Sequence, residues 1–401
     1  MQGINPSSAI GFDARMRYIG NKTKLLDFIG SVLDEQRIQS GIAFDAFSGT
    51  ASVGRYLKRH GFDVYACDLM TYSFVFQKAL IETDCVPQFG QVINSDATLS
   101  AIRRTPAFRR YVDSRFGSQA DLFASTSSDY RAFHDVACYL EQFLPGTDDF
   151  ITTHFSADDS ALGERMFFTR GNARRIDAVR VKLEDWRRSG LLGDGDYYPL
   201  LASLLEAADA VANTTGVYAA FVKSWQANSQ RPLRLSVPNL VINTGRHCEA
   251  IQGDANDVID RVPSLTLLYL DPPYNTRQYS SYYHVPELIA KGWHAGVPSL
   301  RGKTGLIEDS DKKSKWSTRG GCISALDQLL SKADARHVLM SYNSEGIIAE
   351  SEIIRLFKHY GKATSFRTFE LVYDRYRSDS DHEERQYKSD MVTEKIYYVS
   401  R

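Results

Sequence analysis

The feature that most constrains the fold is a set of short apolar segments that mostly alternate with helical patterns. Strands are predicted at 42–47, 63–67, 265–270, 337–342, 365–373 and 394–399, with a weaker candidate at 247–252. Helical periodicity lies between most of them, at 23–36, 51–60, 71–82, 324–333 and 347–358. This alternation predicts an α/β fold with a mainly parallel sheet covered by helices on both faces. The last two strands have no helix between them, so we expect an antiparallel pair at the sheet edge.

A long helical stretch interrupts this alternation. Between 86 and 245 no segment is convincing as a strand, and helical patterns occupy 172–188 and 197–225. We expect residues 1–85 and 246–401 to form one domain and 86–245 to form an inserted, mainly helical one. Residues 165–188 hold eight basic and three acidic side chains, and 210–248 hold four basic and no acidic ones. On charge alone, a solvated helix surface and a face that follows a phosphate backbone explain this equally well.

Two further stretches have the composition of loops. Residues 294–321 are rich in Gly, Ser and Lys, and 374–393 are highly charged. Long loops in a compact domain are usually functional or disordered. Either loop could therefore close over a ligand.

The composition is that of a globular protein. The chain has 401 residues, of which 43% are hydrophobic, and 48 Lys and Arg face 49 Asp and Glu, a net charge of −1. No segment approaches the roughly 18 consecutive apolar residues of a membrane span, and the first residues do not have the pattern of an export signal. Five cysteines without ligand spacing predict reduced thiols and no metal site. We expect a monomeric, cytoplasmic protein with no membrane partner; its near-neutral charge neither indicates nor excludes a nucleic acid.

The first motif with chemical content is FDAFSGTASVG at 44–54, an apolar strand that runs through a small-residue turn into a helix. Gly49 to Gly54 have the spacing of a dinucleotide fingerprint, but Ala51 replaces the middle glycine that lets the backbone approach a pyrophosphate. The turn therefore favours a smaller ligand with an amino and a carboxylate group, which backbone amides and Asp45 would face. An ordinary turn without a ligand stays open for this motif alone.

A second acid ends the next strand. Asp68 in VYACDL follows Gly49 by nineteen residues, and a carboxylate at that strand end can accept hydrogen bonds from both hydroxyls of a ribose. Many aspartates merely end strands. Together with the glycine turn, Asp68 favours a cofactor that contains a nucleoside.

The most specific motif is LLYLDPPYN at 267–275, in which an apolar strand ends in Asp271, Pro272, Pro273 and Tyr274. Ligands of open α/β sheets bind beyond the carboxyl ends of the strands, so we expect these residues in the same crevice as the glycine turn. A Pro-Pro turn that only ends the strand would explain the prolines but neither the acid nor the tyrosine.

These residue types suit methyl transfer to an exocyclic amine, whose lone pair is delocalised into its ring. Two acceptors on the N–H groups favour the pyramidal nitrogen that can attack. Asp271 offers one acceptor, the carbonyl of Pro272 offers the second, and Tyr274 offers a stacking face. With the sulfonium of S-adenosylmethionine as donor, positioning and electrostatics could carry the reaction without a nucleophile or a metal. An amine inside duplex DNA must first be flipped out of the stack.

Three segments, RYIGNKTKLLDFI at 17–29, FDAFSGTASVG at 44–54 and LDPPYNTRQYSSYYHVPELI at 270–289, together carry a family resemblance. The chain resembles the Dam-like DNA adenine-N6 methyltransferases of restriction–modification systems, in the alpha-group motif order. FFTRGNARRIDAVR, ANTTGVYAAFVKSW and HVLMSYNSEGII extend the resemblance over nearly the whole chain. It implies a Rossmann-like methyltransferase sheet interrupted by a target-recognition domain at 86–245, a double-stranded DNA partner and a functional link to a restriction endonuclease. It also implies a prokaryotic protein that is associated with DNA.

The resemblance also implies roles for single residues. Tyr18 and Lys22 match the segment that contacts the methionine end of the cofactor. Phe47 and Gly49 would line the turn, and Asp68 would bind the ribose. Ala51, already noted, stands where this group often has a second glycine.

The acid that contacts the cofactor adenine has two candidates. Asp254 in QGDAND is preferred because it follows the strand expected beside 265–270. Asp96 in INSDAT is the rival, but it falls where the insertion begins.

The predicted activity is therefore that of a site-specific DNA-methyltransferase (adenine-specific). Cytosine N4 methylation is the close alternative, although cytosine enzymes more often carry Ser at the position of Asp271. RNA methylation ranks third, and protein glutamine methylation lower, because it usually accompanies Asn-Pro-Pro-Tyr. An NAD-dependent dehydrogenase, or a non-enzymatic DNA-binding protein with a vestigial cofactor pocket, would leave Asp271 to Tyr274 without a purpose.

Overall fold

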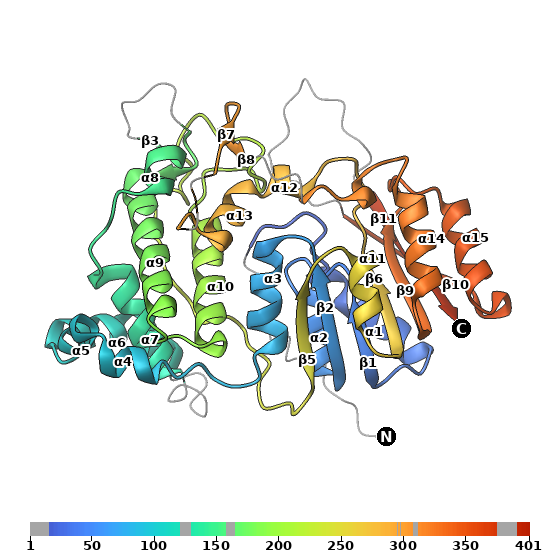
Figure 1. Ribbon diagram of the computed structural model, residues 1–401, viewed down its shortest axis with the longest axis horizontal. Helices are drawn as coiled ribbons and strands as arrows, with labels where there is room; N and C mark the ends of the chain where they lie inside the picture. Colours follow the sequence, from blue (N-terminus) through green and yellow to red (C-terminus); the bar gives the residue numbers. More distant parts are fainter. Residues whose placement is uncertain are drawn as a thin grey trace.

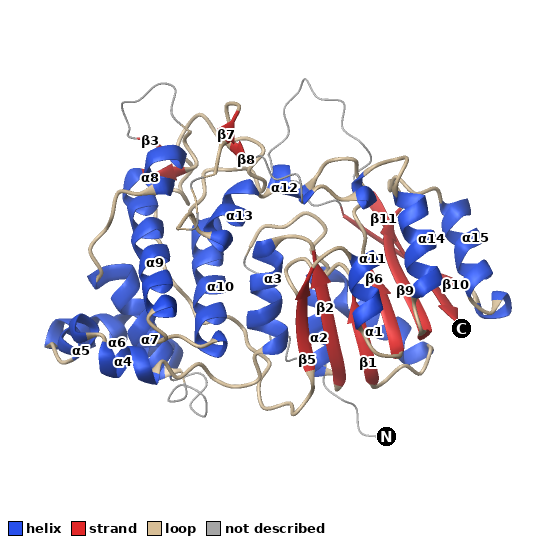
Figure 2. Ribbon diagram, viewed as in Figure 1, coloured by secondary structure: helices blue, strands red, loops and turns tan. Residues whose placement is uncertain are grey.

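A seven-stranded sheet forms the centre of one half of the molecule and a group of helices forms the other (Figures 1 and 2). The computed structural model describes residues 16–120, 130–157, 165–294, 296, 298–307, 312–374 and 391–401. The strands of the sheet are β1 (Gly41–Asp45), β2 (Phe62–Asp68), β5 (Cys248–Gln252), β6 (Leu265–Leu270), β9 (Ala335–Asn343), β10 (Arg367–Asp374) and β11 (Met391–Ser400).

The strand order is β10-β11-β9-β6-β1-β2-β5. Neighbouring strands in the run β9-β6-β1-β2-β5 pair in parallel, whereas β11 pairs antiparallel with both β9 and β10. All seven predicted strands are confirmed, including the weaker one, and so is the terminal antiparallel pair. The first strand ends at Asp45, earlier than predicted, so Ala46 and Phe47 belong to the turn.

Alternating side chains on the strands explain why helices cover both faces of the sheet. Leu267 and Tyr269 of β6 join one hydrophobic core, and Leu268 and Leu270 join the other. The helices of the first face are α1 (Leu26–Glu35), α2 (Ser52–Arg59) and α3 (Thr71–Gln77), and those of the second are α11 (Ala255–Val258), α14 (Cys322–Lys332) and α15 (Glu350–Tyr360). The five helices predicted around the sheet are thus confirmed, and the fold is α/β, with a largely parallel sheet covered by helices on both faces.

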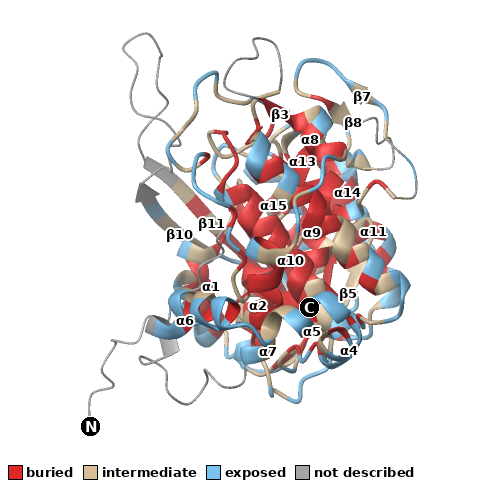
Figure 3. Cartoon of the chain, turned by 90° about the vertical axis from the view of Figure 1, so that its left-hand side faces the viewer, coloured by how far each residue is buried: buried red, intermediate tan, exposed pale blue. Residues whose placement is uncertain are grey.

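Residues 86–245 contribute most of the helices beside the sheet: α4 (Gly90–Ser95), α5 (Ala97–Arg103), α6 (Pro106–Ala120), α7 (Arg131–Cys138), α8 (Phe150–Phe155), α9 (Arg170–Arg188) and α10 (Asp194–Ala210). Helix α10 packs on α3 and on α13 (His284–Lys291). Nearly all of its side chains after the first turn are buried (Figure 3). Its apolar residues join the same core as the first face of the sheet. The division into domains stays a prediction.

Two details predicted for the insertion are wrong. The helix predicted at 197–225 ends at Ala210, where side chains bind its last carbonyls: Arg17 donates to the carbonyl of Asp209 and Asn228 to that of Ala210. The side chain of Asn213 then binds backbone groups beyond the helix. Its Nδ2 donates to the carbonyls of Met166 (3.0 Å) and Val222 (2.8 Å), and its Oδ1 accepts from the N–H of Gln226 (3.0 Å). The segment also holds two short parallel strands, β3 (Ser156–Ala157) and β4 (Phe168–Thr169), where none was predicted.

The predicted loops have different outcomes. Residues 294–321 contain a small antiparallel hairpin, β7 (Leu300–Arg301) with β8 (Leu306–Ile307), and a short 3-10 turn at Lys315–Ser317. Most of the second loop, 375–390, lies outside the described residues. Within the described part of the chain, no helix is both long and apolar enough to cross a membrane.

Each basic residue of the run at 165–188 has a partner within the chain, although Arg170, Arg174 and Arg188 are about half exposed. Arg180 is buried and donates to the carbonyls of Ile289 and Lys291, and Lys182 pairs with Asp96 at 2.6 Å. Partners within the chain also bind the other basic residues, which are Arg165, Arg170, Arg174, Arg175, Arg187 and Arg188. Part of the charge excess is therefore engaged within the protein, and by itself the excess does not identify a DNA-binding face.

Candidate active site

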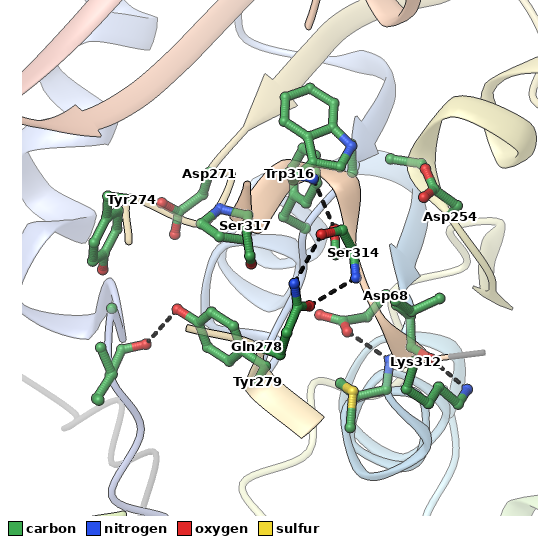
Figure 4. A pocket seen from close by; sticks show the side chains of 18 of the residues that line it. Asp68, Asp254, Asp271, Tyr274, Gln278, Tyr279, Lys312, Ser314, Trp316 and Ser317 are labelled. Carbon is green, nitrogen blue, oxygen red and sulfur yellow. Dashed lines mark hydrogen bonds between the residues drawn. The ribbon is translucent and has the colours of Figure 1, made fainter. Parts of the chain in front are cut away.

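The carboxyl ends of β1, β2 and β6 open into a cavity of about 700 Å³, a volume that includes solvent at its mouth (Figure 4). A smaller cavity of about 280 Å³ lies on the glycine-turn side and shares four lining residues with it: Tyr18, Gly20, Phe47 and Asp271. Parallel strands place their carboxyl ends at one edge of the sheet, which is why motifs far apart in the sequence meet here.

All the predicted site residues except Pro272 line one or both cavities. The larger is lined by Tyr18, Phe47, Asp68, Asp254, Asp271, Pro273 and Tyr274, and the smaller by Tyr18, Lys22, Asp45, Phe47, Gly49 and Asp271. Pro272 is buried. The use of its carbonyl as an acceptor stays a prediction.

Two carboxylates shape the glycine turn. Oδ2 of Asp45 accepts from the N–H of Gly54 at 3.0 Å, and Asp68 accepts from the N–H groups of Gly49 (3.0 Å) and Met70 (2.9 Å). Gly49 has φ +50°, and Ala51 has φ +64° in the left-handed region. The turn therefore forms with alanine in a left-handed conformation, at the cost of a strained φ.

The two acids at the ends of β1 and β2 have raised pKa values. Burial raises the pKa of Asp45 to about 7 and the pKa of Asp68 to about 6, although backbone N–H donors oppose the shift at both residues. Oδ1 of Asp45 has no hydrogen-bond partner in the described part of the chain. An unpaired buried acceptor beside the smaller cavity fits an ammonium group, such as the amino group of a bound methionine moiety.

Asp271 belongs to a buried ion cluster. The ammonium of Lys22 lies 3.1 Å from Oδ1 of Asp271 and 2.6 Å from Oε1 of Glu394. Burial raises the pKa of Asp271 to about 7; Lys22 opposes the shift and Glu394 adds to it. Lys22 lines the smaller cavity as predicted, but its charge is engaged by two carboxylates rather than free for a ligand.

Aromatic rings support the motif residues. Tyr18 stacks on Tyr283 with ring centroids 5.0 Å apart and contacts Tyr72 and Tyr279 at 6.2 and 5.6 Å. The Tyr283 hydroxyl accepts from the N–H of Ile19 at 2.8 Å. These contacts tie the segment at 17–22 to the helices that follow the Asp-Pro-Pro-Tyr motif.

Sequence reasoning missed one wall of the larger cavity. Lys312, Ser314, Trp316 and Ser317 line it, together with Gln278 and Tyr279. Ser314 and Gln278 exchange two hydrogen bonds, one to the Ser314 carbonyl (3.1 Å) and one from its N–H (2.8 Å) (Figure 4). The sequence offered one signal for this wall. Trp316 lies in the loop at 294–321, which is rich in Gly, Ser and Lys and could close over a ligand.

The two candidate acids for the cofactor adenine lie in different places. Asp254 caps α11 and lines the larger cavity. The reason given for preferring it was wrong, because the preceding strand β5 pairs with β2 at the edge of the sheet and not with β6. Asp96 caps α5, accepts from Trp186 Nε1 at 2.9 Å and pairs with Lys182. Asp96 is therefore bound within the helical layer, and only Asp254 of the two lines the cavity.

A protein-family model and several known proteins match this chain. The family model described as D12 class N6 adenine-specific DNA methyltransferase matches residues 18–355. Modification methylase StsI of Streptococcus sanguinis is 30% identical over 387 residues, which is 96% of this chain and 52% of the relative. Type II methyltransferase M.FokI of Planomicrobium okeanokoites is 30% identical over 387 residues, 96% of this chain and 53% of the relative. Type II methyltransferase M.NlaIII of Neisseria lactamica is 30% identical over 389 residues, 96% of this chain and 99% of the relative.

The chain thus spans about half the length of the first two relatives and nearly the whole of the third. No solved structure matches it.

Proposed function

Because the chain belongs to the D12 class of N6 adenine-specific DNA methyltransferases, we propose that it transfers a methyl group from S-adenosyl-L-methionine to the N6 amino group of a flipped-out adenine in a specific double-stranded DNA sequence. One observation carries this proposal. Asp271, the acid of the Asp-Pro-Pro-Tyr motif, lines both cavities and so lies where a donor and an acceptor would meet.

The two cavities would hold different parts of the methyl donor. The larger one would hold the adenosine, with Asp68 at the ribose hydroxyls and Asp254 at the adenine amine. The smaller one would hold the methionine end, with Asp45 and the Gly49 turn facing its amino and carboxylate groups. When bound, the sulfonium supplies an electrophilic methyl group and a neutral leaving group.

The chain's own part in the reaction is to hold the target amine. Asp271 and the carbonyl of Pro272 would accept from the two N6 protons, and Tyr274 would stack on the extruded base. As the nitrogen–methyl bond forms, the sulfur–methyl bond breaks and the nitrogen gives up a proton. A carboxylate with a pKa near 7, such as Asp271, is suited to accept that proton.

The biological setting follows from the relatives, two of which are named as type II methyltransferases and one as a modification methylase. We infer that methylation by this protein protects DNA from a cognate restriction endonuclease. Residues 86–245 remain the proposed target-recognition region.

The test is incubation with S-adenosylmethionine and DNA that lacks methylated bases, followed by mass spectrometry of the nucleosides. N6-methyladenine is expected, and sequencing with detection of modified adenines would give the recognition site. N4-methylcytosine, or no methylated base, would contradict the proposal.

Replacement of the acid tests its assigned role. Asp271→Asn should lower turnover roughly 100-fold or more, because the variant loses the charge at the position where positive charge develops. Asp334→Asn is the matched control, since Asp334 is exposed beside the amino end of β9, at the opposite edge of the sheet. Near-normal turnover in Asp271→Asn would disprove the role of this carboxylate.

A further inference from the structure

A buried charge network lies behind Asp271 and extends to the last strand of the sheet. Glu394 on β11 is 1% exposed and lies outside the segment that the family model matches. Its Oε1 accepts from Lys22 Nζ at 2.6 Å and from Ser341 Oγ at 2.7 Å. Two buried carboxylates therefore share one ammonium, and the ammonium lies closer to Glu394 than to Asp271.

The other titratable groups that face Asp271 come from several elements. They are Asp45 at the end of β1, Tyr269 on β6, Tyr279 on α12 (Tyr279–Tyr282) and Tyr342 on β9, and Tyr274 lies beside Lys22, whose Nζ is 5.3 Å from its ring centroid. Lys22 is the one cation in this set. Its position therefore decides how strongly Asp271 is held in its charged form.

We propose that Glu394 is a positioning residue that acts through Lys22, holding the ammonium beside Asp271 while sharing its charge, so that the Asp271 carboxylate stays available to the target amine. This inference rests on the proposed function for the identity of the amine. A lysine side chain is long and flexible, so a second anchor is needed to keep its charge at one place. Ser341 on the neighbouring strand β9 in turn orients the Glu394 carboxylate.

The network predicts that two substitutions shift the pKa of Asp271 in opposite directions. Glu394→Gln keeps the shape and an oxygen acceptor but removes a negative charge, so Lys22 pairs with Asp271 alone and Asp271 ionises at lower pH. Lys22→Met removes the positive charge, so Asp271 ionises at higher pH. A purely structural role for Glu394 would not produce shifts of opposite sign in the two variants.

The primary test is an infrared pH titration of the protein without cofactor or DNA. The carboxylic-acid band of Asp271 is identified by its loss in Asp271→Asn. We expect its midpoint to fall by roughly 1 pH unit in Glu394→Gln and to rise in Lys22→Met. Equal midpoints in the wild type and Glu394→Gln would overturn the proposal. Thermal unfolding of each variant confirms that it is folded, and Ser341→Ala, which only removes the orienting hydrogen bond, should give a smaller shift of the midpoint.

A second arm measures the single-turnover methylation rate against pH with saturating cofactor and DNA. In Glu394→Gln the fall in rate at low pH should move to lower pH, in step with the infrared midpoint, and the plateau rate above it should also fall, because Lys22 then pairs with Asp271 alone. An unmoved low-pH fall would count against the proposal. Glu350→Gln is the matched control: Glu350 binds Lys395 at 2.9 Å, and Lys395 follows Glu394 but points to the opposite face of the sheet. If the wild type methylates no adenine, the proposed function fails, whereas the infrared titration still decides the network.

Discussion

At the scale of single residues, the site depends on a close approach between Gly20 and Tyr274. A Cβ atom on Gly20 would lie 2.1 Å from the Tyr274 hydroxyl oxygen, and Gly20 has φ +86°. Only glycine meets both conditions, because it has no Cβ and populates positive φ freely. The glycine of the segment at 17–22 thus makes room for the tyrosine of the Asp-Pro-Pro-Tyr motif.

Gly20→Ala should therefore damage the placement of Tyr274. We expect a fall in methyl transfer of roughly 10-fold or more, together with a loss of stability of about 1–2 kcal/mol for the left-handed backbone. Gly61→Ala is the matched control, since Gly61 has φ +88° but a Cβ there would meet nothing within 4 Å. That variant should lose similar stability and keep normal turnover at a temperature where both proteins are folded. Equal turnover in the two variants would refute the proposed contact.

At the scale of elements, the segment at 312–317 closes one side of the larger cavity. Its Trp316 donates to Oδ1 of Asn256 at 3.0 Å and packs edge-on against Phe47 at 4.8 Å. The backbone of Ser314 forms two hydrogen bonds with the side chain of Gln278, which follows the Asp-Pro-Pro-Tyr motif by four residues. The segment thus links the larger cavity, which we propose holds the adenosine of the cofactor, to the side where the target base would enter.

Gln278→Ala removes both hydrogen bonds to Ser314 and should loosen this wall. We expect the affinity for S-adenosylmethionine to fall by roughly 10-fold, since two net hydrogen bonds contribute about 1 kcal/mol each at most sites. Isothermal titration calorimetry measures this directly. The matched control is Gln88→Ala, whose side-chain amide donates to the carbonyl of Val86 and lines neither cavity. An unchanged cofactor affinity in Gln278→Ala would show that the segment does not shape the binding site.

At the scale of the whole molecule, three buried acids gather at one edge of the sheet. Burial raises the pKa values of Asp45 and Asp271 to about 7 and that of Asp68 to about 6. Between roughly pH 4 and pH 7 the folded state therefore binds more protons at these sites than the unfolded state, and their contribution to stability is lost as the pH rises. A cationic ligand would offset this loss, which agrees with a sulfonium cofactor.

Asp45→Asn tests this pH dependence. The variant keeps an oxygen acceptor for the Gly54 N–H but never carries the buried charge. Its stability relative to the wild type should rise by on the order of 1 kcal/mol per pH unit between about pH 4 and pH 7. Urea unfolding of both proteins at several pH values, without cofactor, provides the comparison. Parallel stability curves would mean that Asp45 does not titrate in this range.

Much of the architecture could be predicted from local patterns. The seven strands, the helices around the sheet and the crevice shared by Asp45, Asp68 and Asp271 followed from periodicity and from the rule that parallel strands place their carboxyl ends together. The errors came where side chains reach across the fold. Helix α10 ends where Arg17, which lies distant in the sequence, donates to the carbonyl of Asp209.

The sequence by itself thus determined the class of fold, the family and most of the cavity-lining residues, because these depend on short-range patterns and on motifs at strand ends. The tertiary structure agreed with the preference for Asp254 over Asp96, and it alone decided that residues 312–317 cover the cavity and that Glu394 lies behind Asp271. Each of these depends on which distant segments pack together, and burial in a shared core, rather than any local pattern, determines that packing.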